Sequence, residues 1–233
     1  MASAKGRARG RGTPDAATDT MFALEGGKHA DQVAPQTGSE FHPTPVSAIL
    51  PILETDQLAL PGGVWIEPCA GTGRIVRTVN ETRDDVAWRL FELDPTFEPQ
   101  LSALVRPGRD KLAPFGDFVT RRWPSTWSKA DVLIMNPPFS LAMDFLRVAL
   151  ERAHHVLMLQ SNNWFGSQDR APWLRKFAPD QFTLAKRPSF REDGQTDGVE
   201  YSWFYWGPGG RERRYGRLVM LELARGGQQL LAL

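Results

Sequence analysis

The sequence predicts an α/β protein with a doubly wound, mostly parallel sheet and an antiparallel hairpin near the C-terminus. Short apolar segments alternate with helix-patterned segments between about residues 46 and 160, as in parallel strands joined by crossover helices. A glycine turn, Ala70-Gly71-Thr72-Gly73, links the first strand to a helix. Further on, residues 182–190 and 201–206 are strand-like segments around a polar stretch with two Asp-Gly pairs, which favours a hairpin.

The spacing of apolar residues and the position of glycines and prolines predict each element in chain order. A helix is expected over residues 46–53, where the apolar spacing is helical, and Pro61-Gly62-Gly63 separates it from the first strand. The other expected elements are strands at 64–66, 86–93, 132–135, 155–160, 182–190, 201–206 and 218–223, helices from 74, near 97–104 and over 141–153, and a strand end or turn at 116–118. The aromatic run within 201–206 could be a stacking platform for nucleic acid, but a hairpin strand buried on both faces explains it more simply.

Composition sets limits on organisation and location. The chain has 233 residues, of which 41% are hydrophobic and 24% charged, enough for one substantial core. We expect a flexible arm over 1–38, one domain over 39–225 and a tail over 226–233. A single cysteine rules out an internal disulfide framework, and no apolar stretch has the length of a membrane span, so a cytoplasmic protein is expected.

The charge balance restricts possible polymer partners. A net charge of +1 argues against a strongly basic nucleic-acid binder and leaves only local patches. Basic residues gather near 5–11, 186–191 and 211–217, and each cluster is also compatible with an ordinary solvated surface.

Two strand ends carry groups suited to an adenosine-type ligand. Glu67 ends the first strand and can receive a positive group, while Gly71 and Gly73 let the backbone pass close to a ligand. The turn lacks the Gly-Lys-Ser/Thr ending of a phosphate loop and the third glycine of the dinucleotide pattern. About twenty residues further on, Glu92 stands where such folds bind a ribose hydroxyl pair.

A third strand end adds groups that could recognise a purine. The carboxylate of Asp117 can accept a hydrogen bond from an adenine amino group, and the ring of Phe118 could lie against the base. Each has a plainer interpretation, because acids are common at strand ends and Phe118 could belong to the core.

The tetrapeptide Asn136-Pro137-Pro138-Phe139 follows the apolar strand at 132–135. Two prolines remove two backbone donors and end the strand abruptly. An amide side chain, a carbonyl and an aromatic ring then converge and could hold a flat, amino-bearing ring. The alternative is a proline-rich turn after a buried strand.

These motifs resemble the S-adenosylmethionine-dependent amino-group DNA methyltransferases, above all the short adenine-N6 enzymes of phages and prophages. The resemblance covers most of residues 41–206. It implies a seven-stranded Rossmann-like methyltransferase sheet, S-adenosylmethionine as the cofactor, no metal, and double-stranded DNA as the partner in a bacterial or phage-infected cell. The departure is length, because few residues remain after Trp206 for a separate target-recognition domain.

The resemblance also implies roles for particular residues. Thr44 would help to hold the methionine carboxylate, Glu92 the ribose hydroxyls, and Asp117 the adenine amino group. The full set implied to contact the cofactor is Thr44, Glu67, Pro68, Ala70, Gly71, Gly73, Glu92, Leu93, Asp117, Phe118 and Asn136. The catalytic set is Asn136, Pro137, Pro138 and Phe139.

The chemistry follows from the target amine, whose lone pair is delocalised into its ring. If the Asn136 side-chain oxygen and the Pro137 carbonyl accept the two N–H groups, the nitrogen becomes pyramidal and its lone pair turns toward the methyl donor. A base in a duplex must first be flipped out and then clamped by Phe139 and a second ring. Phe190 is the first candidate for that ring, with a role in the core or in the hairpin as its alternative, and Trp164 and Phe165 are competitors. The neighbouring Arg187 and Arg191 are assigned to substrate binding.

Other functions stay open at this point. The same tetrapeptide suits methylation of N4-cytosine, an RNA base or a protein glutamine, and a non-catalytic nucleic-acid-binding protein is a further alternative. Covalent attack by Cys69 is rejected, because this thiol lies in the presumed cofactor loop. The target sequence and the oligomeric state are left open.

Overall fold

The computed structural model describes residues 43–123, 127–190, 198–208, 213 and 215–224, all within one compact unit, Gly38–Leu233. The predicted arm and tail lie outside the described residues, so the proposed domain boundaries stay predictions. Among the described residues, no helix is long and apolar enough to cross a membrane.

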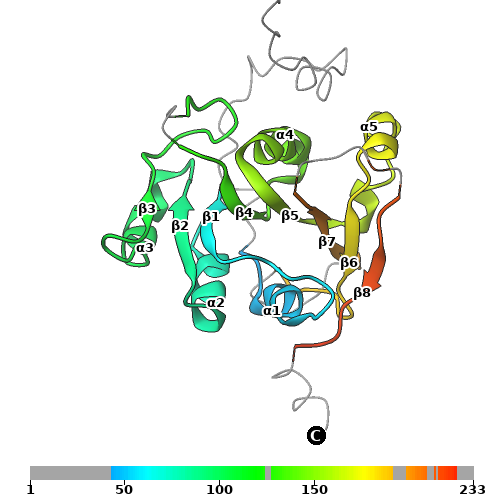
Figure 1. Cartoon of the computed structure of the whole chain (residues 1–233), viewed down its shortest axis with the longest axis horizontal. Coiled ribbons are helices and arrows are strands. Elements are labelled where there is room, and N and C mark those ends of the chain that lie inside the picture. Colours follow the sequence, from blue (N-terminus) through cyan, green and yellow to red (C-terminus); the bar gives the residue numbers. More distant parts are fainter. Residues whose placement is uncertain (1–42, 124–126, 191–197, 209–212, 214, 225–233) are drawn as a thin grey trace, which may run out of the picture. The chain divides into compact units, whose positions relative to one another are not determined.

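One sheet forms the centre of this unit (Figure 1). Its eight described strands are β1 (Gly63–Glu67), β2 (Val86–Leu90), β3 (Lys111–Leu112), β4 (Ala130–Met135), β5 (Ala153–Ser161), β6 (Asp180–Thr183), β7 (Tyr201–Trp206) and β8 (Leu218–Met220). The helices are α1 (Val46–Glu54), α2 (Arg74–Thr82), α3 (Glu98–Ser102), α4 (Ala142–Arg152) and α5 (Ala171–Lys176), with 3-10 turns η1 (Pro95–Phe97), η2 (Phe139–Leu141) and η3 (Asn162–Trp164).

The strand order is β3-β2-β1-β4-β5-β7-β6-β8. Strands β1 to β5 are mutually parallel, and the order reverses between β1 and β4, as in a doubly wound sheet. Strand β7 inserts between β5 and β6 and runs antiparallel to both. The predicted fold class, including the antiparallel pair near the C-terminus, is confirmed.

Several expected boundaries were wrong. The sheet has eight strands rather than seven, because the two-residue β3 at the sheet edge carries too little pattern to be recognised. The strand expected over 182–190 ends at Thr183, before a segment in which Pro188 has no backbone donor. The strand expected over 86–93 ends at Leu90, and α5 was not expected at all.

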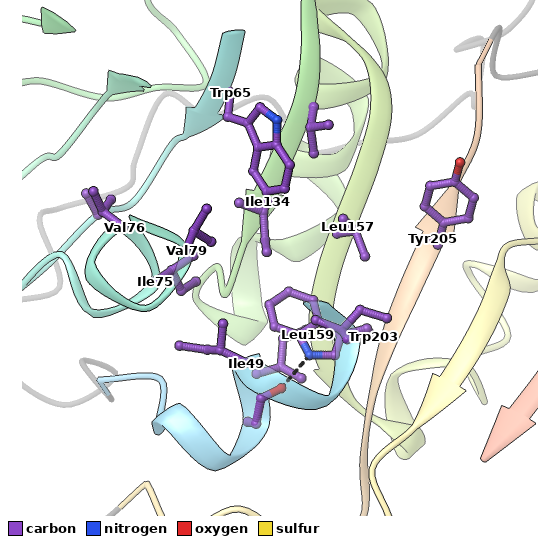
Figure 2. Close-up of a cluster of buried hydrophobic side chains, with 14 of the residues drawn as sticks. Ile49, Trp65, Ile75, Val76, Val79, Ile134, Leu157, Leu159, Trp203 and Tyr205 are labelled. Atoms are coloured by element: carbon purple, nitrogen blue, oxygen red, sulfur yellow. Dashed lines mark hydrogen bonds between the residues drawn. The ribbon is translucent and has the colours of Figure 1, made fainter. Parts of the chain in front are cut away.

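Helices cover both faces of the sheet. Figure 1 shows α1 and α2 on one side and α4 and α5 on the other. Figure 2 shows the first interface, where Ile49 and Ile75 from the helices face Trp65, Leu157 and Trp203 from the strands. Every residue of β7 is buried, which confirms the core interpretation of its aromatic run.

Candidate active site at the carboxyl ends of β1, β2 and β4

Several of the predicted site residues, among them Glu67 and Asn136, lie where the strand order reverses. Glu67 is the last residue of β1 and Asn136 follows β4 directly, and these two strands are paired neighbours. The backbone of Asn136 makes a hydrogen bond with the Cys69 thiol of the glycine turn, so the two segments touch. Ligands of doubly wound sheets bind outside the carboxyl ends of strands at this point.

The glycine turn is held in place by backbone hydrogen bonds. Ala70 N donates to Phe91 O over 2.9 Å, and Gly73 N donates to Ala70 O over 2.7 Å. Gly71 and Gly73 have φ angles of 50° and 72°, which favour glycine. A Cβ atom on Gly73 would lie 2.2 Å from Leu104 Cδ1, so the turn and the chain after α3 approach each other closely.

Glu92 ties this turn to the end of β2. Its Oε2 accepts a hydrogen bond from Gly71 N at 2.6 Å, and its Oε1 accepts from Leu93 N at 2.8 Å and Asp94 N at 3.0 Å. Each carboxylate oxygen can accept about two hydrogen bonds, so Oε2 retains capacity for a ligand hydroxyl. Leu93, beside it, is 54% exposed and available to a ligand.

Glu67 is a buried acid with an unused oxygen. The residue is 2% exposed, and its Oε2 has no hydrogen-bond partner among the described residues. Burial, and after it the charge of Glu92, raises the pKa of Glu67 well above the usual value for a glutamate, while a backbone hydrogen bond from Val76 opposes this. Such a group is suited to receiving a cation, which would supply the missing partner.

Asn136 is oriented by Thr44. The amide nitrogen Nδ2 of Asn136 donates to Thr44 Oγ1 over 3.0 Å, and Thr44 is buried. This bond engages the amide nitrogen and leaves Oδ1 as an acceptor. The hydroxyl predicted to hold a carboxylate therefore contacts the side-chain amide of Asn136 in this structure.

The tetrapeptide backbone turns at its second proline. Pro138 has φ −51° and ψ 134°, and its carbonyl accepts from Leu141 N at 3.0 Å as η2 begins. The carbonyl of Pro137 instead accepts a hydrogen bond from the buried side chain of Gln160, with Nε2 at 3.2 Å. Sequence reasoning missed Gln160, whose only signal was a polar residue ending an apolar strand.

Phe139 presents an aromatic ring to solvent. It is 46% exposed, and its ring centroid lies 6.2 Å from that of Tyr201. Tyr201 in turn packs on Phe190, with 4.8 Å between centroids. Phe190 is 7% exposed and belongs to the hydrophobic core, so it supports Phe139 through Tyr201 and offers no open face of its own.

Two further rings predicted to contact ligands lie inside the core. Phe118 is 2% exposed and stacks on Phe145, with centroids 5.5 Å apart. Trp164 is 5% exposed and packs against Phe204 and Trp206 of β7. Since large apolar rings gain most from burial, Phe118 follows its plainer interpretation and Trp164 offers no open face to a base in this structure. Phe165, the other competitor, is 40% exposed and stacks on Phe204, with centroids 5.8 Å apart.

Two of the remaining predicted polar residues, Asp117 and Arg187, lie at the surface. Asp117 is exposed and accepts hydrogen bonds from Val119 N at 2.8 Å and Thr120 Oγ1 at 2.9 Å, which cap its own turn. Arg187 is half-exposed and forms an ion pair with Glu200 at 2.6 Å. Arg191 lies outside the described residues.

Cys69 is not prepared for nucleophilic attack. Burial, followed by the charges of Glu67 and Glu92, raises the pKa of its thiol well above the usual value. The thiol therefore stays protonated at neutral pH, whereas the thiolate is the nucleophile. This agrees with the rejection of covalent chemistry at Cys69.

Two other features lie apart from this site. Within the described ranges, no group of three or more His, Cys, Asp or Glu residues is arranged to hold a metal ion. A groove of about 360 Å³ lies between α5 and the start of β8, lined in part by Phe165, Arg175 and Tyr215, and neither the tetrapeptide nor the glycine turn contributes to it. This groove is therefore separate from the tetrapeptide and the glycine turn.

Comparison with known proteins places the fold. No protein-family model matches the chain, and no curated protein sequence matches it significantly. Among solved structures, a protein described as an RNA methyltransferase from Pyrococcus horikoshii has a TM-score of 0.50 and 18% identity over 68% of this chain and 81% of its own. A protein described as a class I S-adenosylmethionine-dependent methyltransferase from Listeria monocytogenes has a TM-score of 0.52 and 12% identity over 80% of this chain and 67% of its own.

A third similar structure widens the range of substrates among these neighbours. It is described as an O-methyltransferase from Agrobacterium tumefaciens, with a TM-score of 0.52 and 17% identity over 75% of this chain and 84% of its own. The three neighbours establish that the chain has the Rossmann-like fold of S-adenosylmethionine-dependent methyltransferases. Their identities are too low to transfer a substrate.

Proposed function

We propose that this protein transfers the methyl group of S-adenosylmethionine to the exocyclic N6 amine of adenine in DNA. The observation that carries the proposal is the arrangement of Asn136. Its Nδ2 donates to Thr44, its Oδ1 is left as an acceptor, and the exposed Phe139 ring follows in the same tetrapeptide. This set suits a planar ring that carries an amino group.

The residues at the β1 and β2 ends fit the cofactor. The unpartnered Oε2 of Glu67 would receive the methionine ammonium, and Glu92 would accept from the ribose hydroxyls. The backbone of Gly71 would lie under the methionine portion, and Leu93 would cover the adenine. Pro68, Ala70 and Gly73 complete the turn. The bound cofactor supplies an activated methyl group on a sulfonium.

The chain contributes position and electrostatics. Asn136 Oδ1 and Pro137 O accept the two N–H groups of the target amine, which stabilises the positive charge that develops on nitrogen. The nitrogen lone pair forms the new N–C bond as the sulfur–carbon bond breaks, and the sulfur keeps that electron pair. The extra proton then leaves the nitrogen for solvent, so a strong general base is not required.

Phe139 gives the target base its stacking surface. Stacking on an aromatic ring contributes about 1–3 kcal/mol per base, comparable to the few kcal/mol that unstacking a base from a duplex costs. Phe139 lies beside Tyr201, which itself packs on Phe190, and the exposed part of its ring is proposed to receive the flipped base. Double-stranded DNA is the proposed polymer, with Arg187 and Arg191 near its backbone.

A planar nitrogen also occurs in other substrates. An RNA base is the second candidate, because one structural neighbour is described as an RNA methyltransferase. N4-cytosine and a protein glutamine present the same chemical problem to Asn136 and Pro137. Product analysis separates all four.

The identity of the product tests the proposal directly. The protein is incubated with S-adenosylmethionine carrying an isotope-labelled methyl group and with DNA, RNA and protein, and the digests are analysed by mass spectrometry. We expect label in N6-methyladenine from DNA. Label only in RNA, in cytosine or in glutamine would replace the proposed substrate, and no label in any polymer would contradict methyl transfer itself.

Replacement of Asn136 tests the mechanism. We expect Asn136→Ala to lower kcat by about 100-fold or more, the loss typical of one transition-state hydrogen-bond partner, with little change in cofactor affinity. The matched control is Asn163→Ala, at an exposed asparagine in η3, which should keep wild-type turnover. Equal turnover in Asn136→Ala and wild type would remove Asn136 from the mechanism.

A further inference from the structure

Gln160 lies beside the reacting end of the tetrapeptide. It is the penultimate residue of β5 and is 1% exposed. Strands β4 and β5 are parallel, and Met135 is in register with Met158. Pro137 and Gln160 each follow this pair by two residues and therefore lie side by side, and Gln160 Nε2 donates to Pro137 O over 3.2 Å.

The amide of Gln160 has a defined orientation. Pro137 O can only accept a hydrogen bond, so the donating Nε2 must face it and Oε1 must face elsewhere. That Oε1 is buried and has no partner among the described residues. The neighbouring Ser202 hydroxyl does not relieve it, because it donates to Asn162 Oδ1 at 2.6 Å.

A buried glutamine with an unpaired oxygen is unfavourable for folding. An unsatisfied buried acceptor costs about 1–3 kcal/mol. An apolar residue of similar length would avoid this cost, as the preceding residues of β5, Met158 and Leu159, do. Packing alone therefore does not account for Gln160. The hydrogen bond to Pro137 does.

The carbonyl of Pro137 needs an external partner for its direction. The next residue, Pro138, has no N–H, so the peptide between the two prolines has no donor with which to anchor its plane. A carbonyl oxygen has two lone pairs, and a donor on one of them fixes the direction of the other. Gln160 supplies that donor from the rigid sheet.

We infer that Gln160 is a positioning residue, which directs the free lone pair of the Pro137 carbonyl oxygen toward the target amine. This inference rests on the proposed function, in which Pro137 O accepts one N–H of the amine. Gln160 acts through Pro137 and does not itself need to touch the substrate.

Two substitutions of similar size test the role. Gln160→Met keeps the length but cannot donate, and we expect kcat to fall about 10-fold or more, while KM for DNA and the Kd for S-adenosylhomocysteine change little. Gln160→Glu can donate only when its carboxyl is protonated. Burial raises the pKa of such a carboxyl, so the kcat of this variant relative to wild type should be highest at low pH and fall as the pH rises and the carboxylate forms.

The pH profile separates positioning from a purely structural role. Turnover is expressed per cofactor-binding site, measured by titration with S-adenosylhomocysteine, so that partly unfolded protein does not count. The matched control is Gln181→Met, at a glutamine of β6 that bonds to Asn162, Thr183 and Ser202, and it should keep wild-type turnover. Wild-type kcat in Gln160→Met, or a pH profile of Gln160→Glu parallel to that of wild type, would overturn the inference.

Failure of the proposed function would be recognised separately. If wild type forms no methylated amine, or if Asn136→Ala turns over like wild type, the proposed function is wrong. If wild type is active and Asn136→Ala is impaired while the Gln160 variants behave like wild type, only the role of Gln160 is wrong.

Discussion

Three side chains at the candidate site are partly engaged by the protein and can each still accept a further hydrogen bond. Asn136 commits its nitrogen to Thr44, and Glu92 uses both oxygens to hold Gly71, Leu93 and Asp94. Glu67 keeps one oxygen without a partner among the described residues. The described structure therefore contains acceptors that are already oriented, and the proposed function assigns to them the amino and ammonium groups of its ligands.

Cofactor binding should depend on pH through Glu67. Burial, and after it the charge of Glu92, raises the pKa of Glu67. At pH values somewhat above the usual pKa of a glutamate, the ligand-free protein therefore keeps a proton on Glu67. In the proposed function, the methionine ammonium of the cofactor displaces this proton when it binds. We expect S-adenosylhomocysteine to bind more tightly as the pH rises through this range, with release of a proton. Calorimetry in buffers of different ionisation enthalpy measures that release, and Glu67→Gln should abolish it. Proton release that is the same in Glu67→Gln and wild type would show that another group is responsible.

The stability of the ligand-free protein should depend on pH in the opposite sense. Because folding raises the pKa of the Glu67 carboxyl, this group favours the folded state most at low pH, and its contribution is lost as the pH rises.

Only some of these residue roles could be predicted from sequence. Glu67, Gly71 and Asn136 lie at strand ends marked by glycine or proline, so their proximity follows from parallel pairing. The bond from Asn136 to Thr44 joins residues 92 positions apart, and the bond from Gln160 to Pro137 depends on the β4–β5 register. Neither distance is encoded by local spacing.

At the scale of elements, the glycine turn and α2 form a unit fixed by backbone conformation. Gly73 is the N-cap residue of α2 with φ 72°, and the space where its Cβ would stand is filled by Leu104. Gly108 has nearly the same φ, 73°, but nothing lies within 4 Å of its Cβ position. A comparison of substitutions at these two glycines can therefore distinguish the cost of positive φ from the cost of crowding.

Gly73→Ala should destabilise the protein more than Gly108→Ala. Both variants place a side chain at positive φ, which costs about 1–2 kcal/mol, and only Gly73→Ala must also displace the Leu104 side chain. The free energies of unfolding in urea measure the difference. Equal losses would mean that Leu104 moves away without cost.

Hydrophobic periodicity predicted the long elements correctly, whereas it did not reveal the short ones. The long strands β4 and β5 and the helix α4 appear where the apolar pattern places them. The two-residue β3 and the six-residue α5 owe their conformation to neighbours, namely β2 beside β3 and the aromatic packing of Trp173 against Trp206. Tertiary contacts override weak local preference in such segments.

At the scale of the whole described unit, its first helix is bound to one of its last strands. Trp203 of β7 is fully buried and donates from Nε1 to Ala48 O of α1 over 2.8 Å (Figure 2). Trp206 makes a comparable bond, from Nε1 to Phe177 O over 3.0 Å, on the other side of the sheet. The pair offers a matched test of what holds α1 in place.

Trp203→Phe should loosen α1 in particular. The loss of one buried hydrogen bond and some ring volume costs about 1–3 kcal/mol in either tryptophan variant. Hydrogen exchange should accelerate in peptides covering residues 46–54 in Trp203→Phe but not in Trp206→Phe. The same exchange pattern in both variants would show that α1 is held by the general core instead.

The sequence by itself determined the order and type of the main elements, the polar groups at the strand ends and the chemistry those groups can perform, because these depend on local pattern and on residue type. The tertiary structure decided which groups are free. It buried Phe118, Phe190 and Trp164, left Phe139 open, and brought Thr44 to Asn136 and Gln160 to Pro137. The reason is physical: burial and hydrogen-bond partners depend on what packs from distant parts of the chain, which periodicity cannot encode.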